Sequence, residues 1–596
     1  MNIAFYFKSI FIIIIFLFNN FSFFNNNKNC IINCIGEKKQ NNKIIEENFF
    51  IIDSNNLEQI LPHMYGFCVS EKGILTDNYY KQLGKYEEPE PQGVYIMIRK
   101  IGNKIILNQD YSGSFGLYSY ENKNDNYFAL SNSFLLLEEY LVGKKNISFN
   151  KDFADNFIIT NLCTYSIYET LINEIIQIPS NSYIEIDIDM KKKNIYYIDY
   201  QLNTIPLESN KGLKIIDKWI DKWAFILRSL KKKTDNVSFD LSGGFDTRTL
   251  LTILLNSGIN LNEILIKSYK NKEHGHDEDF KISNDIASKF GFKINNKNLD
   301  KKFTKLSLED TLFITFYSKL GFHKEFYLKN LFFNNPRFNF MGSGGEHLRG
   351  YPGKPIKKFI DSISLQNISN HQKEFYDSSF RLLNRSISLL TNKQKLDNNY
   401  EISYNLYSYA TGKNHFGKAA LEAFLSNMYF LQPLMDPDIK KIKYNINSKS
   451  SHDLIAFIYT RFAPDLISFP FQGKRSINLT SITYSENLNN KLKEYKIKSN
   501  YNKNFYIDFK RTLSIKNNNR QESAQTYLKE LFNSNRFRRL INIKYDIQVY
   551  NWAKKYSKQS NYFPLRHEYG LLAVGLSIEK LVLNEKYKNK FDNKNQ

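Results

Sequence analysis

A short glycine-containing turn between two apolar stretches is the part of this sequence best suited to chemistry. Apolar residues alternate from Val237 to Leu241, then Ser242, Gly243 and Gly244 follow, and helix-spaced apolar residues continue until Gly258. The pattern predicts a strand, a tight turn and a helix. The backbone amides of such a turn and the positive end of the helix together form a site for an anion, most naturally a phosphate.

Asp246 falls in the first turn of the predicted helix. A carboxylate beside a phosphate site is favourable when a cation lies between them, so we interpret Asp246 as a ligand of Mg²⁺ bound with a polyphosphate. The alternative is an ordinary acidic residue that stabilises the positive end of the helix. The phosphate interpretation also requires that neighbouring side chains leave the amides of the turn open to a ligand.

The residues from Ser242 to Thr247 resemble the SGGxDS pyrophosphate loop of the ATP-pyrophosphatase superfamily, and their context resembles its asparagine synthetase branch. Thr247 stands where the superfamily usually has serine, and it keeps the hydroxyl group. The loop is not a Walker loop, because no Gly-Lys-Ser/Thr run follows the glycines. The resemblance implies that ATP is bound with Mg²⁺ as its cofactor, through Ser242, Gly243, Gly244, Asp246 and Thr247.

Size and charge narrow the class of protein. At 596 residues the chain is too long for one ordinary core, so two or more domains are expected. The net charge of +22 would suit a nucleic-acid partner, but the lysines are scattered in an Asn- and Ile-rich background, so nucleic acid is not favoured. The four cysteines form neither a disulfide framework nor a convincing metal-ligand spacing, which indicates a reducing compartment.

The N-terminus carries an apolar run from Ile10 to Phe18, and the apolar stretch reaches back to Ile3. Three interpretations stay open: a secretory leader without a clear cleavage site, a short membrane tether through residues 3–18, and a misassigned start. The lysines that follow the run would keep the body of the chain inside the cell. We therefore expect a cytoplasmic body and leave the tether to the cytoplasmic membrane open.

Composition and pattern divide the chain into four parts. We expect a mixed α/β fold, in which an antiparallel β-rich N-terminal domain precedes a doubly wound parallel α/β domain with a helical C-terminal extension. The expected boundaries are 1–47 for a hydrophobic leader and polar linker, 48–205 for the β-rich domain, 212–480 for the α/β domain, and 481–596 for a basic helical extension that caps it.

The β-rich part is predicted from two hairpins. One runs from Val94 to Leu107 around the turn Gly102-Asn103, and the other runs from Tyr183 to Ile198, with Ile184, Ile186, Ile188 and Met190 on one face. This part also resembles the class II glutamine amidotransferase domain fused ahead of asparagine synthetases. The matching segments are Asp110 to Tyr118, Ser131-Asn132 and Glu169 to Pro179.

The resemblance lacks its nucleophile. The family places a cysteine directly after the initiator methionine, whereas Asn2 follows Met1 here, and Cys30 and Cys34 are internal. We therefore expect a degenerate domain without its own glutaminase activity, which supports the second domain. Ammonia would then come from solution or from a separate glutaminase.

The α/β part is predicted to alternate strands and helices after an amphipathic helix from Gly212 to Lys232. A strand at Glu263–Tyr269 and a helix at Glu278–Phe290 follow the phosphate loop, which implies a parallel sheet with its ligand at the carboxyl ends of the strands. His274 and His276 lie in a charged loop, and we interpret them as solvated rather than metal-binding. A further helix is expected from Thr411 to Phe430.

Three later segments also resemble the asparagine synthetase family. Phe338 to Tyr351 resembles its G-x-[GS]-D-E-L-x-x-G-Y segment, which makes Glu346 a catalytic and Mg²⁺-binding candidate beside Arg349, although Gly345 replaces an aspartate. The alternative for Glu346 is a helix-capping acid. Arg461 to Arg475 resembles the loop of the catalytic lysine, which falls on Lys474 and would stabilise charge on a leaving pyrophosphate.

The third segment, Leu431 to Asp436, resembles R-x-P-F-L-D, but Leu431 replaces the arginine and Tyr429 replaces an upstream glutamate. These losses argue against strict asparagine synthesis. We expect an ATP-dependent, AMP-forming amide ligase that activates a small-molecule or peptide carboxylate for attack by ammonia or an amine. The alternatives are a catalytically silent nucleotide-binding scaffold and a tRNA-modifying ATP pyrophosphatase.

Overall fold

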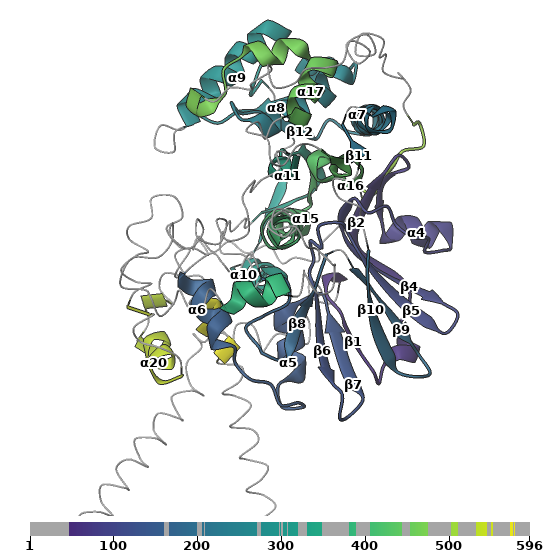
Figure 1. Cartoon of the computed structure of the whole chain (residues 1–596), viewed down its shortest axis with the longest axis vertical. Coiled ribbons are helices and arrows are strands. Elements are labelled where there is room, and N and C mark those ends of the chain that lie inside the picture. Colours follow the sequence, from purple (N-terminus) through teal and green to yellow (C-terminus); the bar gives the residue numbers. More distant parts are fainter. Residues whose placement is uncertain are drawn as a thin grey trace, which may run out of the picture.

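The structure is a computed structural model in which part of the chain is described. The predictions for residues 3–18, Cys30, Cys34, Arg349 and Arg475 lie outside that part. The described residues are 47–159, 166–180, 182–198, 205–207, 209–270, 276–296, 299, 302–306, 308–319, 331–348, 381–388, 406–443, 453–474, 502–509, 532–533, 535–544, 550–551, 572–575 and 577–578. They form a mixed α/β fold with antiparallel and parallel sheets, as predicted (Figure 1).

Two sheets build the N-terminal part of the chain. The first has the order β1-β7-β6-β8, and the second has the order β10-β9-β5-β4-β2-β3-β19. The strands of the first sheet are β1 (Ile51–Asp53), β6 (Leu117–Asn122), β7 (Tyr127–Ser131) and β8 (Ile175–Ile178). Those of the second are β2 (His63–Ser70), β3 (Gly73–Thr76), β4 (Gly93–Ile101), β5 (Lys104–Gln109), β9 (Ser182–Asp187), β10 (Lys192–Tyr197) and β19 (Tyr506–Ile507). Helices η2 (Leu57–Gln59), α4 (Asp77–Leu83), α5 (Phe134–Leu141) and α6 (Lys151–Ile159) accompany these sheets.

Both predicted hairpins are present. Strands β4 and β5 pair antiparallel, and Ile101 lies opposite Lys104 across a two-residue turn in which Gly102 has a φ of +57°. In the β9–β10 hairpin Ile184 and Ile186 are fully buried on one face. The prediction that Met190 shares this face is wrong, because residues 188–191 form the turn and Met190 is 64 % exposed.

A parallel sheet organises the second part of the chain. Its order is β13-β12-β16-β17, and all neighbouring strands run parallel. The strands are β12 (Val237–Asp240), β13 (Leu265–Lys267), β16 (Arg337–Phe340) and β17 (Met428–Leu431). Helix α7 (Asn210–Lys233) precedes β12, helix α8 (Phe245–Asn256) follows it, and α9 (His276–Phe290) ends at Gly291, whose φ is +71°. The predicted strand–turn–helix units are confirmed.

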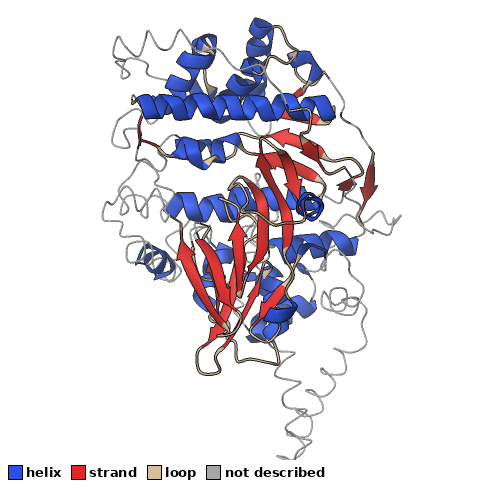
Figure 2. Ribbon diagram, turned by 90° about the vertical axis from the view of Figure 1, so that its right-hand side faces the viewer, coloured by secondary structure: helices blue, strands red, loops and turns tan. Residues whose placement is uncertain are grey.

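Figure 2 shows helices that cross the upper half of the molecule. Shorter helices and strands complete the described part of the chain. They are β11 (Ile205–Pro206), η4 (Leu261–Glu263), β14 (Phe303–Lys305), α10 (Leu308–Lys319), β15 (Leu331–Phe333), α11 (Gly345–Leu348), the π-helix η6 (Tyr407–Gly417), α15 (Lys418–Leu425), η7 (Pro433–Met435), α16 (Pro437–Lys440), β18 (Ile442–Lys443), α17 (Asp453–Phe462), η8 (Pro464–Ser468), η9 (Gln472–Lys474) and α20 (Asn535–Lys544).

The predicted helix over 411–430 begins and ends too late along the chain. Helical structure ends at Leu425, and the chain turns at Asn427 with a φ of +60° before it enters β17. Asparagine tolerates this left-handed conformation better than most residues. Because β17 follows at once, Tyr429 and Leu431 belong to the parallel sheet.

The two parts share one continuous hydrophobic core. The ring of Phe67 on β2 packs 5.5 Å from Phe424 on α15 and 4.8 Å from Tyr429 on β17, measured between ring centroids. Aromatic pairs at this separation contribute about 0.5–1.5 kcal/mol beyond the area they bury. The β-rich part is therefore packed directly against the parallel sheet.

The C-terminal extension makes a contact that the sequence did not predict. Strand β19 pairs parallel with β3 of the N-terminal sheet, with Tyr506 opposite Gly73. A Cβ on Gly73 would come within 2.3 Å of the carbonyl oxygen of Tyr506, so only glycine permits this approach. The described part of the extension thus adds a strand to the β-rich part.

No helix among the described residues is long and apolar enough to cross a membrane.

Candidate functional site

The predicted phosphate loop joins β12 to α8 and is held together by hydroxyl groups. The backbone amide of Ser242 donates to Oγ1 of Thr247 at 3.0 Å, and the two hydroxyl oxygens also lie 3.0 Å apart. The amide of Gly244 donates to Oγ of Ser242 at 3.2 Å. Thr247 therefore closes the loop through its hydroxyl, the group that it shares with serine.

An acid from α9 occupies the remaining glycine amide. The amide of Gly243 donates to Oδ1 of Asp279 at 2.8 Å, and Oδ2 of the same buried carboxylate lies 3.2 Å from Nδ1 of His276. The expectation that side chains leave the amides of the turn open is therefore wrong, because those of Ser242, Gly243 and Gly244 all donate to side-chain oxygens. A phosphate can reach the amide of Gly243 only after Asp279 moves away.

The first turn of α8 offers a different kind of donor. Gly244 directly precedes this 12-residue helix as its N-cap, and it brings no side chain to cap the first amides. Such a helix end favours a negatively charged ligand. An anion bound here would meet the end of α8 and the hydroxyl groups of Ser242 and Thr247, with Asp279 as a competing acid.

The second glycine segment lies directly on this helix end. A Cβ on Gly342 would lie 2.9 Å from the backbone nitrogen of Thr247, and a Cβ on Gly345 would lie 2.1 Å from Cγ and Oδ1 of Asp246. The carboxylate of Asp246 therefore rests against the backbone of the residue that precedes Glu346. The structure thus brings Asp246 against the segment that carries Glu346.

The pair fits a magnesium ion that also binds phosphate. Both Asp246 and Glu346 are half-buried, and Mg²⁺ is held in nucleotide sites by one or two carboxylates together with phosphate oxygens and water. Among the described residues no group of three or more His, Cys, Asp or Glu side chains gathers to hold a metal. Two carboxylates would leave most of the positions around a magnesium ion to phosphate oxygens and water.

Gly345 has a packing reason to replace the aspartate of the resembled family. Any side chain at this position would displace the Asp246 carboxylate, because its Cβ would lie 2.1 Å from Cγ and Oδ1 of Asp246. The neighbouring Gly344 has a φ of +86° and would place a Cβ 2.1 Å from Sδ of Met435 in η7. The loop is thus clamped between α8 and η7.

A buried lysine beneath this loop was missed by sequence reasoning. Nζ of Lys440 lies 3.6 Å from Sδ of Met435 and 4.7 Å from the ring centroid of Tyr111. Burial lowers the pKa of Lys440 to about 7, while the negative charges of Asp436 and Glu346 oppose the shift. The only signal in the sequence was a lysine next to an apolar residue, Ile439, in a short helix.

Asp436 is a structural residue of the same corner. Its Oδ2 accepts from Nε1 of Trp223 at 3.0 Å and from Nζ of Lys222 at 2.9 Å, while its Oδ1 accepts from the amide of Asp438 at 3.0 Å. These bonds fix α16 against α7. The segment from Leu431 to Asp436 is therefore anchored although the arginine of the resembled family is absent.

The segment that carries Lys474 lies beside the phosphate loop. The amide of Gln472 donates to the carbonyl oxygen of Gly243 at 3.1 Å, and the amide of Gly473 donates to Oε2 of Glu278 at 3.0 Å. The backbone of η9 thus reaches the loop as predicted. The side chain of Lys474 lies outside the part of the chain that the structure describes.

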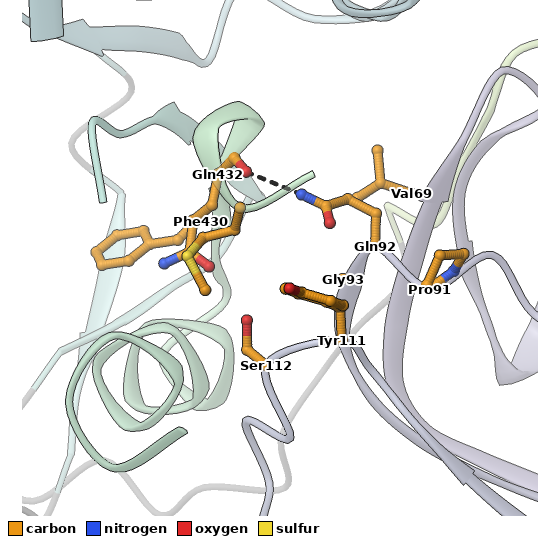
Figure 3. Close-up of a pocket in the computed structure, with 9 residues that line it drawn as sticks. Val69, Pro91, Gln92, Gly93, Tyr111, Ser112, Phe430 and Gln432 are labelled. Atoms are coloured by element: carbon orange, nitrogen blue, oxygen red, sulfur yellow. Dashed lines mark hydrogen bonds between the residues drawn. The ribbon is translucent and has the colours of Figure 1, made fainter. Parts of the chain in front are cut away.

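A small cavity lies where the β-rich part meets the parallel sheet (Figure 3). Nε2 of Gln92 donates to the carbonyl oxygen of Gln432 at 2.8 Å across this boundary. The cavity measures about 10 Å³, which is room for a single water molecule. Its lining residues are Val69, Pro91, Gln92, Gly93, Tyr111, Ser112, Phe430, Gln432 and Met435.

The segments that resemble the amidotransferase domain lie at the boundary between the β-rich part and the part with the parallel sheet. Asp110 is fully buried and accepts from the amides of Tyr95, Ser112 and Ser114 at 3.0–3.2 Å. Two buried lysines from η6 and α15 enter the same region: Lys413 donates to the carbonyl oxygen of Ile178 at 2.6 Å, and Lys418 donates to that of Phe115.

Burial governs the protonation of these groups. It raises the pKa of Asp110 to about 6 and lowers the pKa of Lys413 to about 7, in each case against favourable charges or hydrogen bonds nearby. Burial also raises the pKa of Cys68 to about 12, which leaves the thiol protonated. Cys68, the free cysteine in the described part of the chain, is therefore unsuited to act as the missing nucleophile.

Comparison with models of known protein families finds no match to this sequence. No curated protein matches it either.

Proposed function

We propose that the protein is an ATP-dependent, AMP-forming amide ligase. The observation that supports this best is the meeting of three sequence-distant segments at the carboxyl ends of β12 and β16: the phosphate loop, the glycine segment with Glu346, and the backbone of η9. In open parallel sheets, ligands bind at this edge. The resemblance of these segments to the asparagine synthetase family points to the same chemistry.

The proposed roles follow from position. The hydroxyl groups of Ser242 and Thr247 and the first amides of α8 would bind the phosphates of ATP. Asp246 and Glu346 would hold Mg²⁺, which when bound neutralises charge on those phosphates. Lys474 would stabilise the charge that develops on the leaving pyrophosphate.

The proposed reaction has two steps. An oxygen of a small-molecule or peptide carboxylate attacks the α-phosphorus of ATP, and the bond to pyrophosphate breaks, which gives an acyl-adenylate. Ammonia or an amine then attacks the acyl carbon, AMP leaves, and an amide forms. Holding both partners at one edge of the sheet supplies much of the rate by proximity.

The nitrogen source and the location of the protein belong to the same proposal. Cys68 is buried with a raised pKa, so ammonia from solution, from a separate glutaminase, or an amine in the substrate would serve as nucleophile. The use of ATP places the body of the chain in the cytoplasm. A tether to the membrane through residues 3–18 remains part of the proposal.

Trapping the acyl-adenylate tests this function without knowledge of the natural acceptor. The full chain is incubated with ATP, Mg²⁺, pools of carboxylates and hydroxylamine, and pyrophosphate, AMP and hydroxamate are measured together. We expect equal amounts of the three products, and a loss of about 100-fold or more in Asp246→Asn. The exposed Asp285→Asn on α9 is the matched control and should keep the wild-type rate. Hydroxamate formation that is unchanged in Asp246→Asn would contradict the proposal.

One observation favours a second candidate, a catalytically silent nucleotide-binding scaffold. Asp279 already satisfies the amide of Gly243, as an internal acid would in a loop that no longer turns over pyrophosphate. Under this alternative, ATP binds without release of pyrophosphate in any carboxylate pool. The same assay separates the two candidates.

A further inference from the structure

Arg248 is a buried cation near the centre of the candidate site. It lies in the first half of α8, is fully buried, and among the described residues all its hydrogen bonds go to backbone carbonyl oxygens. Buried charges are usually paired with opposite charges. Burial lowers the pKa of Arg248 to about 10, so the guanidinium stays charged at neutral pH.

The carbonyl groups that it binds belong to one segment and to the phosphate loop. Nη1 donates to the carbonyl oxygens of Leu466 at 3.4 Å and Phe469 at 3.0 Å, and Nη2 donates to that of Pro470 at 2.7 Å. Nη2 also lies 3.4 Å from the carbonyl oxygen of Gly243. One guanidinium therefore connects the loop with the chain just ahead of Lys474.

An aromatic stack completes the attachment. The guanidinium carbon of Arg248 lies 3.8 Å from the ring centroid of Phe471, and this ring stacks on Phe245 at 4.2 Å with an interplanar angle of 23°. Phe471 is buried and precedes Gln472 and Gly473 directly. A cation over a ring face is attracted most strongly when water is excluded, as it is here.

Only arginine can make this set of bonds. Its planar fork presents several donors in fixed directions, whereas lysine has a single flexible ammonium group and methionine has no donor. An apolar residue would fill the same space without the penalty of a buried charge. We therefore explain the buried arginine by the position in which it holds residues 466–470, and not by a contribution to the stability of the core.

We propose that Arg248 is a positioning residue that holds segment 466–474 against the phosphate loop and thereby sets where Lys474 stands relative to the phosphates. The holding of the segment is independent of the proposed function. The consequence for Lys474 rests on the proposed function.

Hydrogen exchange tests the holding of the segment directly. We compare the amides of Gln472 and Gly473 in the full-length wild type, Arg248→Met, Arg248→Lys and Phe471→Leu. Arg228→Met is the matched control, because Arg228 also donates to a backbone carbonyl, that of Ser257, at 3.1 Å.

We expect exchange at 472–473 to be about tenfold faster or more in Arg248→Met and Phe471→Leu, intermediate in Arg248→Lys, and unchanged in the control. The amides of α7 should keep their wild-type rates. Unchanged exchange at 472–473, or an equal acceleration throughout the domain, would overturn the proposal. If Arg248→Met fails to fold, Arg248→Lys and Phe471→Leu carry the test.

A double-mutant cycle tests the consequence for Lys474. Arg248→Lys should lower kcat for pyrophosphate release by about 100-fold per folded molecule with the KM for ATP within about threefold, because small displacements of a catalytic group have effects of this size. The double variant Arg248→Lys/Lys474→Ala should be no slower than Lys474→Ala alone. If the double variant shows the product of the two single losses in kcat, the role of Arg248 through Lys474 is overturned. A wild type that releases no pyrophosphate would sink the proposed function, while the exchange result would still decide whether Arg248 holds the segment.

Discussion

The backbone amide of Gly243 and the carboxylate of Asp279 form a 2.8 Å hydrogen bond in the turn where a phosphate oxygen would bind. Asp279 comes from the first turn of α9, so two helices that follow neighbouring parallel strands meet at this bond. The bond has an electrostatic consequence. A carboxylate held at this point would repel the phosphates of a nucleotide bound at the loop.

Removing Asp279 should therefore strengthen anion binding. In Asp279→Ala the amide of Gly243 becomes available and one negative charge is lost, and we expect the affinity for inorganic pyrophosphate with Mg²⁺ to rise by about tenfold. Asp279→Asn keeps an acceptor without the charge and should give a smaller gain. Isothermal titration calorimetry measures both, with Asp285→Ala on the exposed face of α9 as the control. Weaker binding in Asp279→Ala would instead assign this acid to the metal.

A side chain at position 345 should disturb Asp246. In Gly345→Ala the new Cβ would lie 2.1 Å from Cγ and Oδ1 of Asp246, so this carboxylate must move from its present position. We expect the affinity for ATP with Mg²⁺ to fall by about tenfold or more, and the free energy of unfolding to fall by about 1–3 kcal/mol.

Ser343→Ala, in the same loop, is the control for this variant and should leave both quantities within about twofold and about 0.5 kcal/mol of the wild type. Titration calorimetry and urea unfolding give the two values. Wild-type affinity in Gly345→Ala would show that the contact between Asp246 and this loop has no part in binding.

Local patterns predicted the elements that depend on neighbouring residues. The β4–β5 hairpin follows from strand alternation around Gly102, and the end of α9 follows from Gly291, because glycine adopts the positive φ that each position requires. The strand–turn–helix around Ser242 was likewise predicted, since apolar spacing changes from alternate to helical across the glycines.

Contacts between segments that are distant in the sequence could not be predicted from local patterns. Asp279 reaches Gly243 from 36 residues away, and Lys413 reaches the carbonyl oxygen of Ile178 from 235 residues away. Strand β19 pairs with β3 across most of the chain, although nothing in the two residues Tyr506 and Ile507 marks them as a sheet edge. Such pairings are fixed by tertiary packing, to which local propensity is a weak guide.

The buried charges between the two parts should make stability depend on pH. In the folded protein the pKa of Lys413 is about 7, whereas the unfolded chain has the usual value near 10.5. Below pH 7 both states carry the proton, so the full penalty of burying the charge is present. Between pH 7 and 10.5 the unfolded chain holds more protons, so the free energy of unfolding rises with pH.

Replacing this lysine should remove its share of that rise, while the buried Lys418 and Lys440, whose pKa values are also lowered, keep theirs. We expect Lys413→Met to raise the free energy of unfolding by about 1–4 kcal/mol near pH 6.5 and by less as the pH approaches 10. The groups that face Lys413 are Asp110, Tyr118 and Lys418, and Asp110, with a pKa raised to about 6, titrates below this window. Urea unfolding from pH 6.5 to 10 measures the difference.

The exposed Lys214→Met on α7 is the control and should follow the wild-type curve. A constant difference between Lys413→Met and wild type at every pH would contradict the pKa assigned to this lysine.

Equilibrium binding of ATP with Mg²⁺ to the full chain tests the central claim most directly, because it needs neither the acceptor nor the nitrogen source. We expect saturable binding at one site with a Kd below about 1 mM. We expect at least a tenfold loss in Asp246→Ala and in Gly243→Ala, because the new Cβ of the latter would lie 2.8 Å from Cδ1 of the buried Ile282 and would displace the loop. Absence of binding to the wild type, or binding to both variants that is as tight as to the wild type, would contradict the account.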